Sequence, residues 1–222
     1  MVGMNLDFAQ LVPSIPYILY GVWVTLQFVA VSLVLGFLWG TVLSLFKIGK
    51  ITILRWFADA YTSIFRGTPL ILQMLLIYYA IPQLTGVDIG AFTAGVLTFA
   101  LNSAAYISEI IRAGINAVDK GQKEAAMALG VPYRTMMLKI ILPQAFKNIL
   151  PALMNEFITL TKESAIVSVI GALDIMRRAQ IVGASNYRFF EPLLLAGLVY
   201  YLLVMLLTLA GRVLERRLAK SD

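Results

Sequence analysis

Carboxylates and hydrogen-bonding side chains occur in two groups inside otherwise apolar stretches of this 222-residue chain. The first group follows one helical face at i, i+4 and i+7, with a serine beside it: Asn102, Tyr106, Glu109 and Ser103. The second follows one face at i, i+3 and i+7, with a serine after its last member: Glu156, Thr159, Glu163 and Ser164. At membrane depth such side chains face a bundle interior or an aqueous cavity. Their carboxylates can receive an ammonium group there, and their hydroxyl and amide groups can supply neutral hydrogen bonds.

The chain contains no cysteine and no histidine. This excludes disulfides, thiolate nucleophiles, histidine-based metal sites and Ser-His-Asp triads. An intramembrane enzyme with a dyad of Lys162 and a serine, Ser164 or Ser168, is a rival interpretation. An active dyad normally converges from separate elements, however, and these residues are close in the sequence. We therefore expect no catalytic residue, no metal site and no cofactor held by this chain.

The composition is that of a membrane protein. Hydrophobic residues make up 60% of the chain and charged residues 14%, whereas a soluble domain has about 45–50% and about 25%. A net charge of +6 suggests nucleic acid as a partner in a soluble protein. Here the basic residues stand at the ends of apolar blocks, where lipid headgroups and topology explain them better. We expect an all-α polytopic protein whose surroundings are a lipid bilayer, with no nucleic-acid partner.

Five apolar blocks predict five transmembrane helices, since one crossing takes about 20 residues. The expected spans are residues 17–46, 56–81, 91–111, 149–173 and 192–211. Gly36 and Gly40 give the first span a small-residue face suited to close helix approach. Pro69 should kink the second span, and residues 174–191 should form a polar loop. Because no repeat and no second domain are visible, we expect residues 1–222 to form a single transmembrane permease domain.

The lysines and arginines between the blocks predict the orientation. If the C-terminal tail and residues 119–144 face the cytoplasm, the outer segments hold three basic residues and the cytoplasmic segments thirteen. The thirteen are Lys47, Lys50, Arg55, Arg112, Lys120, Lys123, Arg134, Lys139, Lys147, Arg212, Arg216, Arg217 and Lys220. The positive-inside rule then places the N-terminus outside and the C-terminus inside. Five spans also require the two termini to lie on opposite sides of the membrane, so the span count agrees with the charge distribution.

Residues 119–144 form the longest soluble and basic run between two apolar blocks, so they must lie in water. Residues 123–129 are good helix formers, and Gly130 is placed to stop that helix. Pro132 suits the first turn of a second helix, which should run from about residue 133 to 141 and end before Pro143. We expect a compact helix, a sharp turn and a second helix.

This segment carries a pattern that resembles the EAA signature of ABC importer permeases. The matching residues are Glu124, Ala125, Ala126, Gly130, Ile140, Leu142 and Pro143. The resemblance implies a type I ABC importer permease fold, in which this loop is a coupling helix that docks on the ATP-hydrolysing subunit. The implied coupling residues are Gly121, Glu124, Ala125, Ala126, Leu129 and Gly130. The alternative is an amphipathic loop whose alanine-rich face packs on its own transmembrane helices.

Three further strings look like the branch of this family that imports polar amino acids and opines: residues 66–70 (RGTPL), 101–106 (LNSAAY) and 168–171 (SVIG). For Arg66 the alternative is a headgroup contact at a helix start. The resemblance implies ATP-driven alternating access in the bacterial cytoplasmic (inner) membrane. It also implies a second permease subunit, identical or a close paralogue, two ATPase subunits that bind ATP and Mg, and an extracellular or periplasmic amino-acid-binding protein.

The substrate follows less directly. The branch often has an acidic or amide residue at the position of Glu163, so the carboxylate favours a basic amino acid such as arginine, lysine or histidine. Glutamine, glutamate and opines are the alternatives, and Glu163 could instead pair with Lys162 or Arg66. We expect Glu109, one turn from Arg112, to pair locally. An ion-coupled secondary transporter can also have intramembrane carboxylates, but it would not need a loop with this signature.

Overall fold

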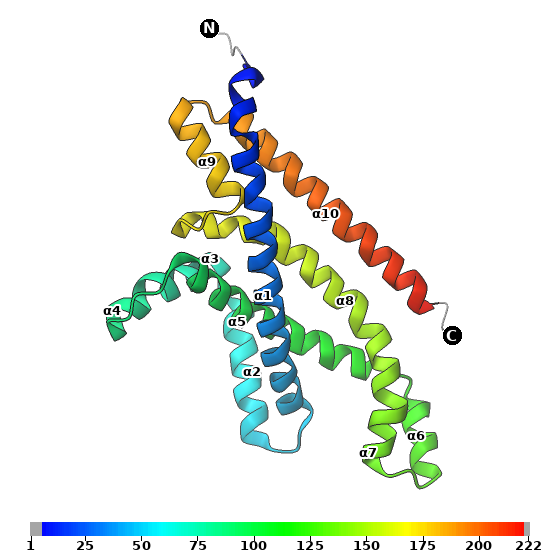
Figure 1. Cartoon of the computed structure of the whole chain (residues 1–222). Coiled ribbons are helices and arrows are strands. Elements are labelled where there is room, and N and C mark those ends of the chain that lie inside the picture. The colour runs from blue at the N-terminus through cyan, green and yellow to red at the C-terminus, as the bar shows by residue number, and fades with distance from the viewer. Residues whose placement is uncertain (1–5, 220–222) are drawn as a thin grey trace. The chain divides into compact units, whose positions relative to one another are not determined.

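The computed structural model describes residues 6–219, and every regular element in that range is a helix (Figure 1). The all-α prediction is therefore confirmed for these residues, whereas Lys220, counted in the basic tail, lies outside them. By length and composition, three helical stretches can cross a membrane: Phe8–Ile48, Ala91–Asn116 and Phe190–Arg217. The broken helix pair Thr52–Gly67 and Leu70–Thr85 makes a fourth if it counts as one span.

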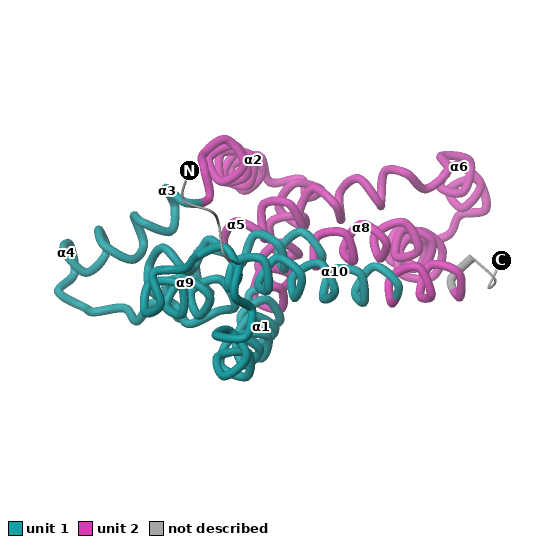
Figure 2. Tube along the Cα trace, turned by 90° about the horizontal axis from the view of Figure 1, so that it is seen from above, with its two compact units in different colours: residues 1–32, 71–99, 158–209 teal, residues 33–70, 100–157, 210–222 magenta. Residues whose placement is uncertain are grey.

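The helices divide into two compact units, coloured separately in Figure 2. Unit 1 comprises residues 1–32, 71–99 and 158–209, and unit 2 comprises residues 33–70, 100–157 and 210–222. Four long helices contribute residues to both units: α1 (Ile15–Ile48), α5 (Ala91–Asn116), α8 (Leu142–Glu163) and α10 (Phe190–Ala219). Each unit has its own apolar packing.

Unit 1 adds several short elements to its parts of the long helices. They are the 3-10 helix η1 (Phe8–Ser14), α3 (Leu70–Leu75), the π-helical turn η2 (Leu76–Ala80), α4 (Ile81–Thr85), the 3-10 helix η4 (Ser164–Ile170) and α9 (Ile175–Asn186). Its core joins η1, α1, α9 and α10 through buried side chains such as Ile18, Ile175 and Val199. Gly21 permits the closest approach, because a Cβ there would lie 2.6 Å from the backbone nitrogen of Ile175.

The prediction of a polar loop at residues 174–191 is wrong, because most of this segment forms helix α9 (Ile175–Asn186). Asp174 caps this helix by accepting a hydrogen bond from the backbone N–H of Arg177 at 2.8 Å. Ile175, Ala179 and Val182 recur at helical spacing and are buried in the unit 1 core. The spacing of these apolar residues was present in the sequence, but the surrounding polar residues obscured it.

Unit 2 contains α2 (Thr52–Gly67), α6 (Lys120–Ala128), α7 (Tyr133–Met136) and the π-helical turn η3 (Met137–Ile141), together with its parts of the long helices. The predicted small-residue contact on α1 is confirmed. A Cβ on Gly36 would lie 2.9 Å from the Cβ of Ser103, and one on Gly40 would lie 2.9 Å from the carbonyl oxygen of Ala104. Glycine at both positions therefore allows α1 to lie directly against α5.

Proline has different effects at two places in the chain. At Pro69 the predicted kink is confirmed and is a full break, because α2 ends at Gly67 and Thr68 takes an extended conformation (φ −118°, ψ 147°). The predicted end before Pro143 is wrong, since helix continues from η3 into α8. In η3 the N–H of Leu142 donates to the carbonyl of Met137. This wider π-helical turn accommodates the proline ring.

The boundaries predicted for the fourth span, residues 149–173, are also wrong. Helix α8 begins at Leu142 and ends at Glu163, and the tighter helix η4 follows up to Gly171, which has a φ of +85°. With its charged and amide side chains, α8 is not among the stretches that qualify as spans by length and composition.

Candidate functional site

The predicted coupling segment forms helix α6, a short turn and helix α7 (Figure 1). The carboxylate of Asp119 starts α6 by accepting a hydrogen bond from the backbone N–H of Gly121 at 2.7 Å. At the other end, Gly130 has a φ of +68°, in the left-handed region that favours glycine. The predicted end of this helix at Gly130 is confirmed.

Two backbone hydrogen bonds hold the turn. The N–H of Val131 donates to the carbonyl of Ala126 at 3.0 Å, and the N–H of Gly130 donates to that of Met127 at 3.0 Å. This pair of bonds is the Schellman motif, which satisfies carbonyls that a helix end leaves free. The sharp reversal between α6 and α7 is therefore built into the backbone.

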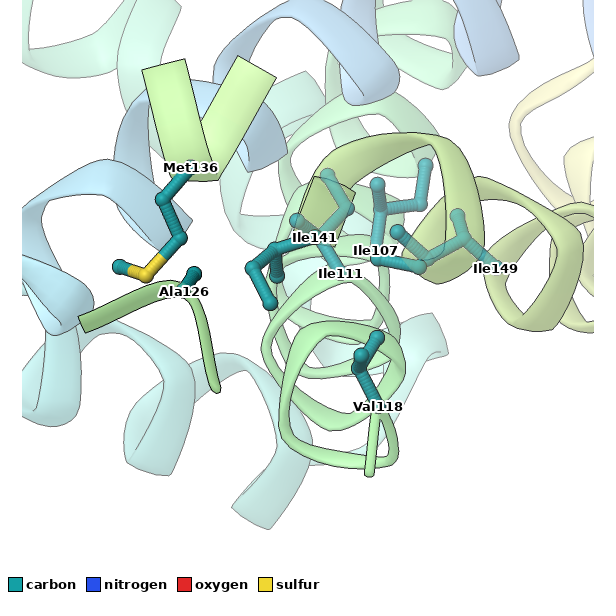
Figure 3. Packing of buried hydrophobic residues seen from close by; sticks show 8 residues of the cluster. Ile107, Ile111, Val118, Ala126, Met136, Ile141 and Ile149 are labelled. Atoms are coloured by element: carbon teal, nitrogen blue, oxygen red, sulfur yellow. The ribbon is translucent and has the colours of Figure 1, made fainter. Parts of the chain in front are cut away.

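One face of α6 packs against the rest of unit 2 (Figure 3). Ala126 is 3% exposed and lies against Met136 of α7. Both belong to a cluster that joins α6 and α7 to α5 and α8: Ile107, Ile111, Val118, Ala126, Met136, Ile141, Ala145 and Ile149. The cluster therefore connects α6 and α7 to α5 and α8 through close-packed side chains.

The other face of α6 is open. Gly121, Glu124 and Ala125 are exposed, and the side chain of Leu129 is 81% exposed. A groove of about 420 Å³ lies beside this helix, and its lining includes Lys120, Lys123, Glu124, Met127 and Tyr133. Exposed apolar side chains among charged ones are typical of a docking surface. Buried Ala126 supports the interpretation that the segment packs on its own helices, whereas the exposed residues around it leave room for a partner, so docking stays a prediction.

Of the predicted substrate residues, unit 2 brings two together from distant parts of the sequence. The hydroxyl of Ser103 on α5 donates to Oε1 of Glu156 on α8 at 3.0 Å. Ser103 is fully buried and Glu156 is half-buried. The neighbouring Asn102 uses its amide Nδ2 to donate to the carbonyl of Phe65, at 3.0 Å, near the end of α2.

The remaining predicted substrate residues belong to unit 1. Thr159 is half-buried and Glu163 is exposed, and both lie on the continuous helix α8, which preserves their predicted spacing. Ser164 is buried, and its hydroxyl donates to the carbonyl of Thr161, three residues earlier, at 2.8 Å. Among the described residues, no ion pair joins Glu163 to its neighbour Lys162 within 4 Å.

The carboxylate of Glu109 pairs with two basic residues, which confirms the predicted local pairing with Arg112. One oxygen accepts from Arg112 Nη2 at 2.6 Å, and the other forms an ion pair with Lys47 Nζ. The ammonium of Lys47 also donates to the hydroxyl of Thr62 at 2.8 Å and lies 3.5 Å from Asp59. The side chain of Lys47 is only 4% exposed. Sequence reasoning assigned Lys47 to a surface loop and missed this link between α1, α2 and α5, since no spacing connects residues so far apart.

Arg178 was counted as an outer loop residue and is instead buried. Its guanidinium lies over the rings of Tyr17 and Tyr20, 4.5 and 4.8 Å from their centroids. It also donates to the carbonyls of Leu173 and Tyr17, at 3.0 and 3.3 Å. This arginine fastens the start of α9 to α1 and is structural.

Apolar helices long enough to cross a membrane, an exposed α6–α7 segment and the half-buried carboxylate of Glu156 are features of a membrane transport subunit. Residues 32–220 match the model of the family described as "Binding-protein-dependent transport system inner membrane component", and the chain belongs to this family. The expectation of an ABC transporter permease is confirmed, and the chain is a multi-pass membrane protein.

The relatives cover nearly the whole chain. The arginine transport system permease protein ArtQ of Bacillus subtilis is 59% identical over 219 residues, which is 99% of this chain and 100% of the relative. The putative glutamine transport system permease protein GlnP of Rickettsia bellii is 51% identical, over 94% of this chain and 96% of the relative. The glutamate/aspartate import permease protein GltK of Escherichia coli is 36% identical, over 96% and 98%.

Solved structures show the same fold. A crystal structure of an amino acid ABC transporter with histidines superposes with a TM-score of 0.93 and 45% identity, over 96% of this chain and 100% of that one. The MetNI methionine ABC transporter in an inward-facing conformation gives a TM-score of 0.76 and 25% identity, over 93% and 98%.

Proposed function

We propose that this chain is the membrane-spanning permease subunit of an ATP-binding-cassette importer that takes up polar amino acids, with arginine, lysine and histidine preferred. The observation that carries the proposal is the α6–α7 protrusion. Its inner face is packed into the cluster around Ala126 and Met136, and its outer face exposes Glu124 and Leu129. A rigid element with one free face is suited to receive force from a partner.

The same contacts support a route from that partner to the substrate residues. Closure of two ATPase subunits on ATP would displace α6, and the cluster would carry the displacement to Ile107 on α5 and Ile149 on α8. Ser103 lies one turn before Ile107, and Glu156 lies two turns after Ile149. Rocking of these helices would open a path for the substrate alternately to the outside and to the cytoplasm. ATP and Mg are bound by the ATPase, and this chain contributes no catalytic residue.

The proposed substrate residues are Asn102, Ser103, Glu156, Thr159, Glu163 and Ser164. An amino acid brings an ammonium into a low-dielectric cavity, where an unpaired charge is costly. Two carboxylates on α8 can neutralise that ammonium and a cationic side chain. The arginine transport relative from B. subtilis supports this preference. Glutamine or glutamate is the second candidate, favoured by the names of the R. bellii and E. coli relatives.

The proposed topology has five spans, with α8 as the fourth, the N-terminus outside and the C-terminus inside. It rests on the distribution of basic residues and on the likeness to type I importer permeases. Residues 1–222 would then form one transmembrane permease domain in the bacterial cytoplasmic (inner) membrane. Its partners would be two ATPase subunits, a second copy of this chain or a close paralogue, and an extracellular or periplasmic amino-acid-binding protein.

Uptake of labelled L-arginine into proteoliposomes tests the function. The complex is purified from native membranes and reconstituted with its binding protein and internal ATP. We expect ATP-dependent uptake that unlabelled lysine and histidine reduce more than glutamine or glutamate. Strong competition by glutamate with none by lysine would contradict the preference for basic substrates. Uptake that follows a proton or sodium gradient without ATP would contradict the importer class.

A charge reversal tests the docking surface. Glu124→Lys should leave the chain inserted in the membrane but abolish both co-purification of the ATPase and uptake, because it reverses a charge on the open face of α6. Glu215→Lys is the matched control, since Glu215 is an exposed carboxylate on the last helix. Normal uptake by the Glu124→Lys variant would contradict the assigned docking face.

A further inference from the structure

Tyr187, in the short loop between α9 and α10 (Figure 1), has a backbone conformation that tyrosine rarely adopts. It follows the last residue of α9 with a φ of +55° and a ψ of 28°, and among residues 6–219 it is the one non-glycine residue with a positive φ. The left-handed region is disfavoured for residues with a Cβ, because that atom crowds the following carbonyl oxygen. Glycine usually occupies such a position at a helix end. A tyrosine there needs a reason other than ending the helix.

Packing within the chain does not supply that reason. The side chain of Tyr187 is 92% exposed, which makes it the most exposed of the large hydrophobic side chains in the described range. Among the same residues, no side-chain hydrogen bond and no aromatic contact includes it. Strained backbone that persists without benefit to its own fold is a reason to infer a function at that residue.

The residues around Tyr187 hold this conformation in place. The backbone N–H groups of Tyr187 and Arg188 both donate to the carbonyl of Gly183. The guanidinium of Arg188 then donates to Oε1 of Glu191 through Nε at 3.0 Å and through Nη2 at 2.8 Å. The same oxygen accepts from the backbone N–H of Asp7 at 3.1 Å, and the Glu191 side chain is only 5% exposed. The loop is therefore tied to α9, to α10 and to the chain before η1.

The surface beside Tyr187 is mixed in character. Ser185 and Asn186 are exposed polar residues, and the ring of Phe189 is 49% exposed although it lies against α9. A Cβ on Gly183 would be 2.7 Å from that ring, so the glycine lets it lie flat on the helix. An aromatic side chain with polar neighbours is typical of the anchor residues of protein interfaces, where tyrosine is enriched. Tyrosine offers a large contact area at a low cost in conformational entropy.

The occupant of this surface follows from its side and its rigidity. The loop immediately precedes the last span, so the proposed topology places it outside the membrane. Lipid headgroups also attract tyrosine, but a fluid surface has no fixed shape that would require a strained and fastened backbone. A folded protein has such a shape, and a pre-organised loop lowers the cost of binding it.

We propose that Tyr187 is an anchor for the extracellular or periplasmic amino-acid-binding protein. Its side chain inserts into a recess on that protein when the protein delivers the amino acid. Arg188 and Glu191 are positioning residues, because they hold the loop in the conformation that presents the ring. This inference rests on the proposed function and adds a contact point for one of its partners.

Replacement by glycine tests the proposal, because docking and folding should respond in opposite directions. Tyr187→Gly removes the strain, so the thermal midpoint of the purified permease–ATPase complex should stay equal or rise. Loss of the ring should raise the dissociation constant of the purified binding protein for this complex in nanodiscs by about 10- to 100-fold, as for an interface anchor. Tyr187→Ala keeps the strain and should lose the same affinity. In uptake assays, Tyr187→Gly should need more binding protein for half-maximal uptake and reach the same maximum.

Trp56→Ala is the control, since Trp56 is a 74% exposed aromatic residue on α2 that the proposed topology places at the cytoplasmic side. It should leave the affinity for the binding protein unchanged. Wild-type affinity of Tyr187→Gly, or a lost affinity accompanied by a lower thermal midpoint, would overturn the assignment. A loss seen in nanodiscs but not in detergent would assign the ring to lipid and overturn it as well. These outcomes leave the proposed function intact, whereas wild-type uptake that needs no ATP would contradict the function itself.

Discussion

Replacing Gly130 by alanine should weaken docking of the ATPase through backbone strain alone. An added Cβ at Gly130 would meet no atom within 4 Å, so no steric clash occurs. The φ of +68°, however, costs an L-residue about 1–2 kcal/mol. If the partner binds only the intact turn between α6 and α7, this cost appears as an affinity about 5- to 30-fold lower, since 1.4 kcal/mol is a factor of about ten.

The assay is a titration of the purified ATPase subunit against the permease in nanodiscs. Gly130→Asn should lie close to the wild type, because asparagine tolerates the left-handed region better than other residues with a side chain. Gly197→Ala is the matched control. Gly197 lies inside helix α10 with equally open space and no positive φ, so alanine there should preserve the affinity and add helix stability. Equal affinities of Gly130→Ala and Gly197→Ala would refute the reasoning.

Three further predictions concern substitutions at Lys47 and Met136 in unit 2 and at Asp174 in unit 1. Lys47→Met should destabilise the chain by about 1–3 kcal/mol in detergent denaturation, because the buried ammonium and its hydrogen bonds are lost while Glu109 keeps Arg112 as a partner. Adding Glu109→Gln should recover part of the loss, and strictly additive losses would contradict the pairing. Met136→Ala should cost about 2–5 kcal/mol and reduce coupled ATPase activity, whereas an unchanged thermal midpoint would contradict its place in the cluster. Burial raises the pKa of the Asp174 carboxyl, although the Arg177 N–H and the Tyr200 hydroxyl oppose it. The folded state therefore loses stability as pH rises above about 4, and Asp174→Asn, which can still cap α9, should flatten that dependence between acid and neutral pH.

Local signals in the sequence predicted most of the helices. The uncharged run over residues 17–46 corresponds to α1, and Gly130 marks the end of α6 because glycine adopts the left-handed turn without strain. Pro69 predicted the break after α2 for the same kind of local reason. In contrast, Pro143 is accommodated by a π-helical turn that depends on its surroundings, and no rule based on the residue type alone anticipates it.

The site was predictable only as sets of residues on helix faces. Helical spacing placed Ser103 and Glu156 in separate groups, and their hydrogen bond depends on how α5 and α8 pack. The same holds for Lys47, whose partners on α2 and α5 come from distant parts of the sequence. Arg178 shows a limit of predicting topology from charge. The positive-inside rule counts every basic residue as exposed, but Arg178 is buried against the rings of Tyr17 and Tyr20.

The central claim is that the open face of α6 is held by a cytoplasmic ATPase. Because the chain has no cysteine, Leu129→Cys introduces a unique thiol at a side chain that is 81% exposed. The measurement is thiol crosslinking in native membranes, combined with labelling of intact cells by a membrane-impermeant maleimide. We predict a crosslink to the ATPase subunit and no labelling from outside. Labelling of intact cells without any crosslink to the ATPase would contradict the account.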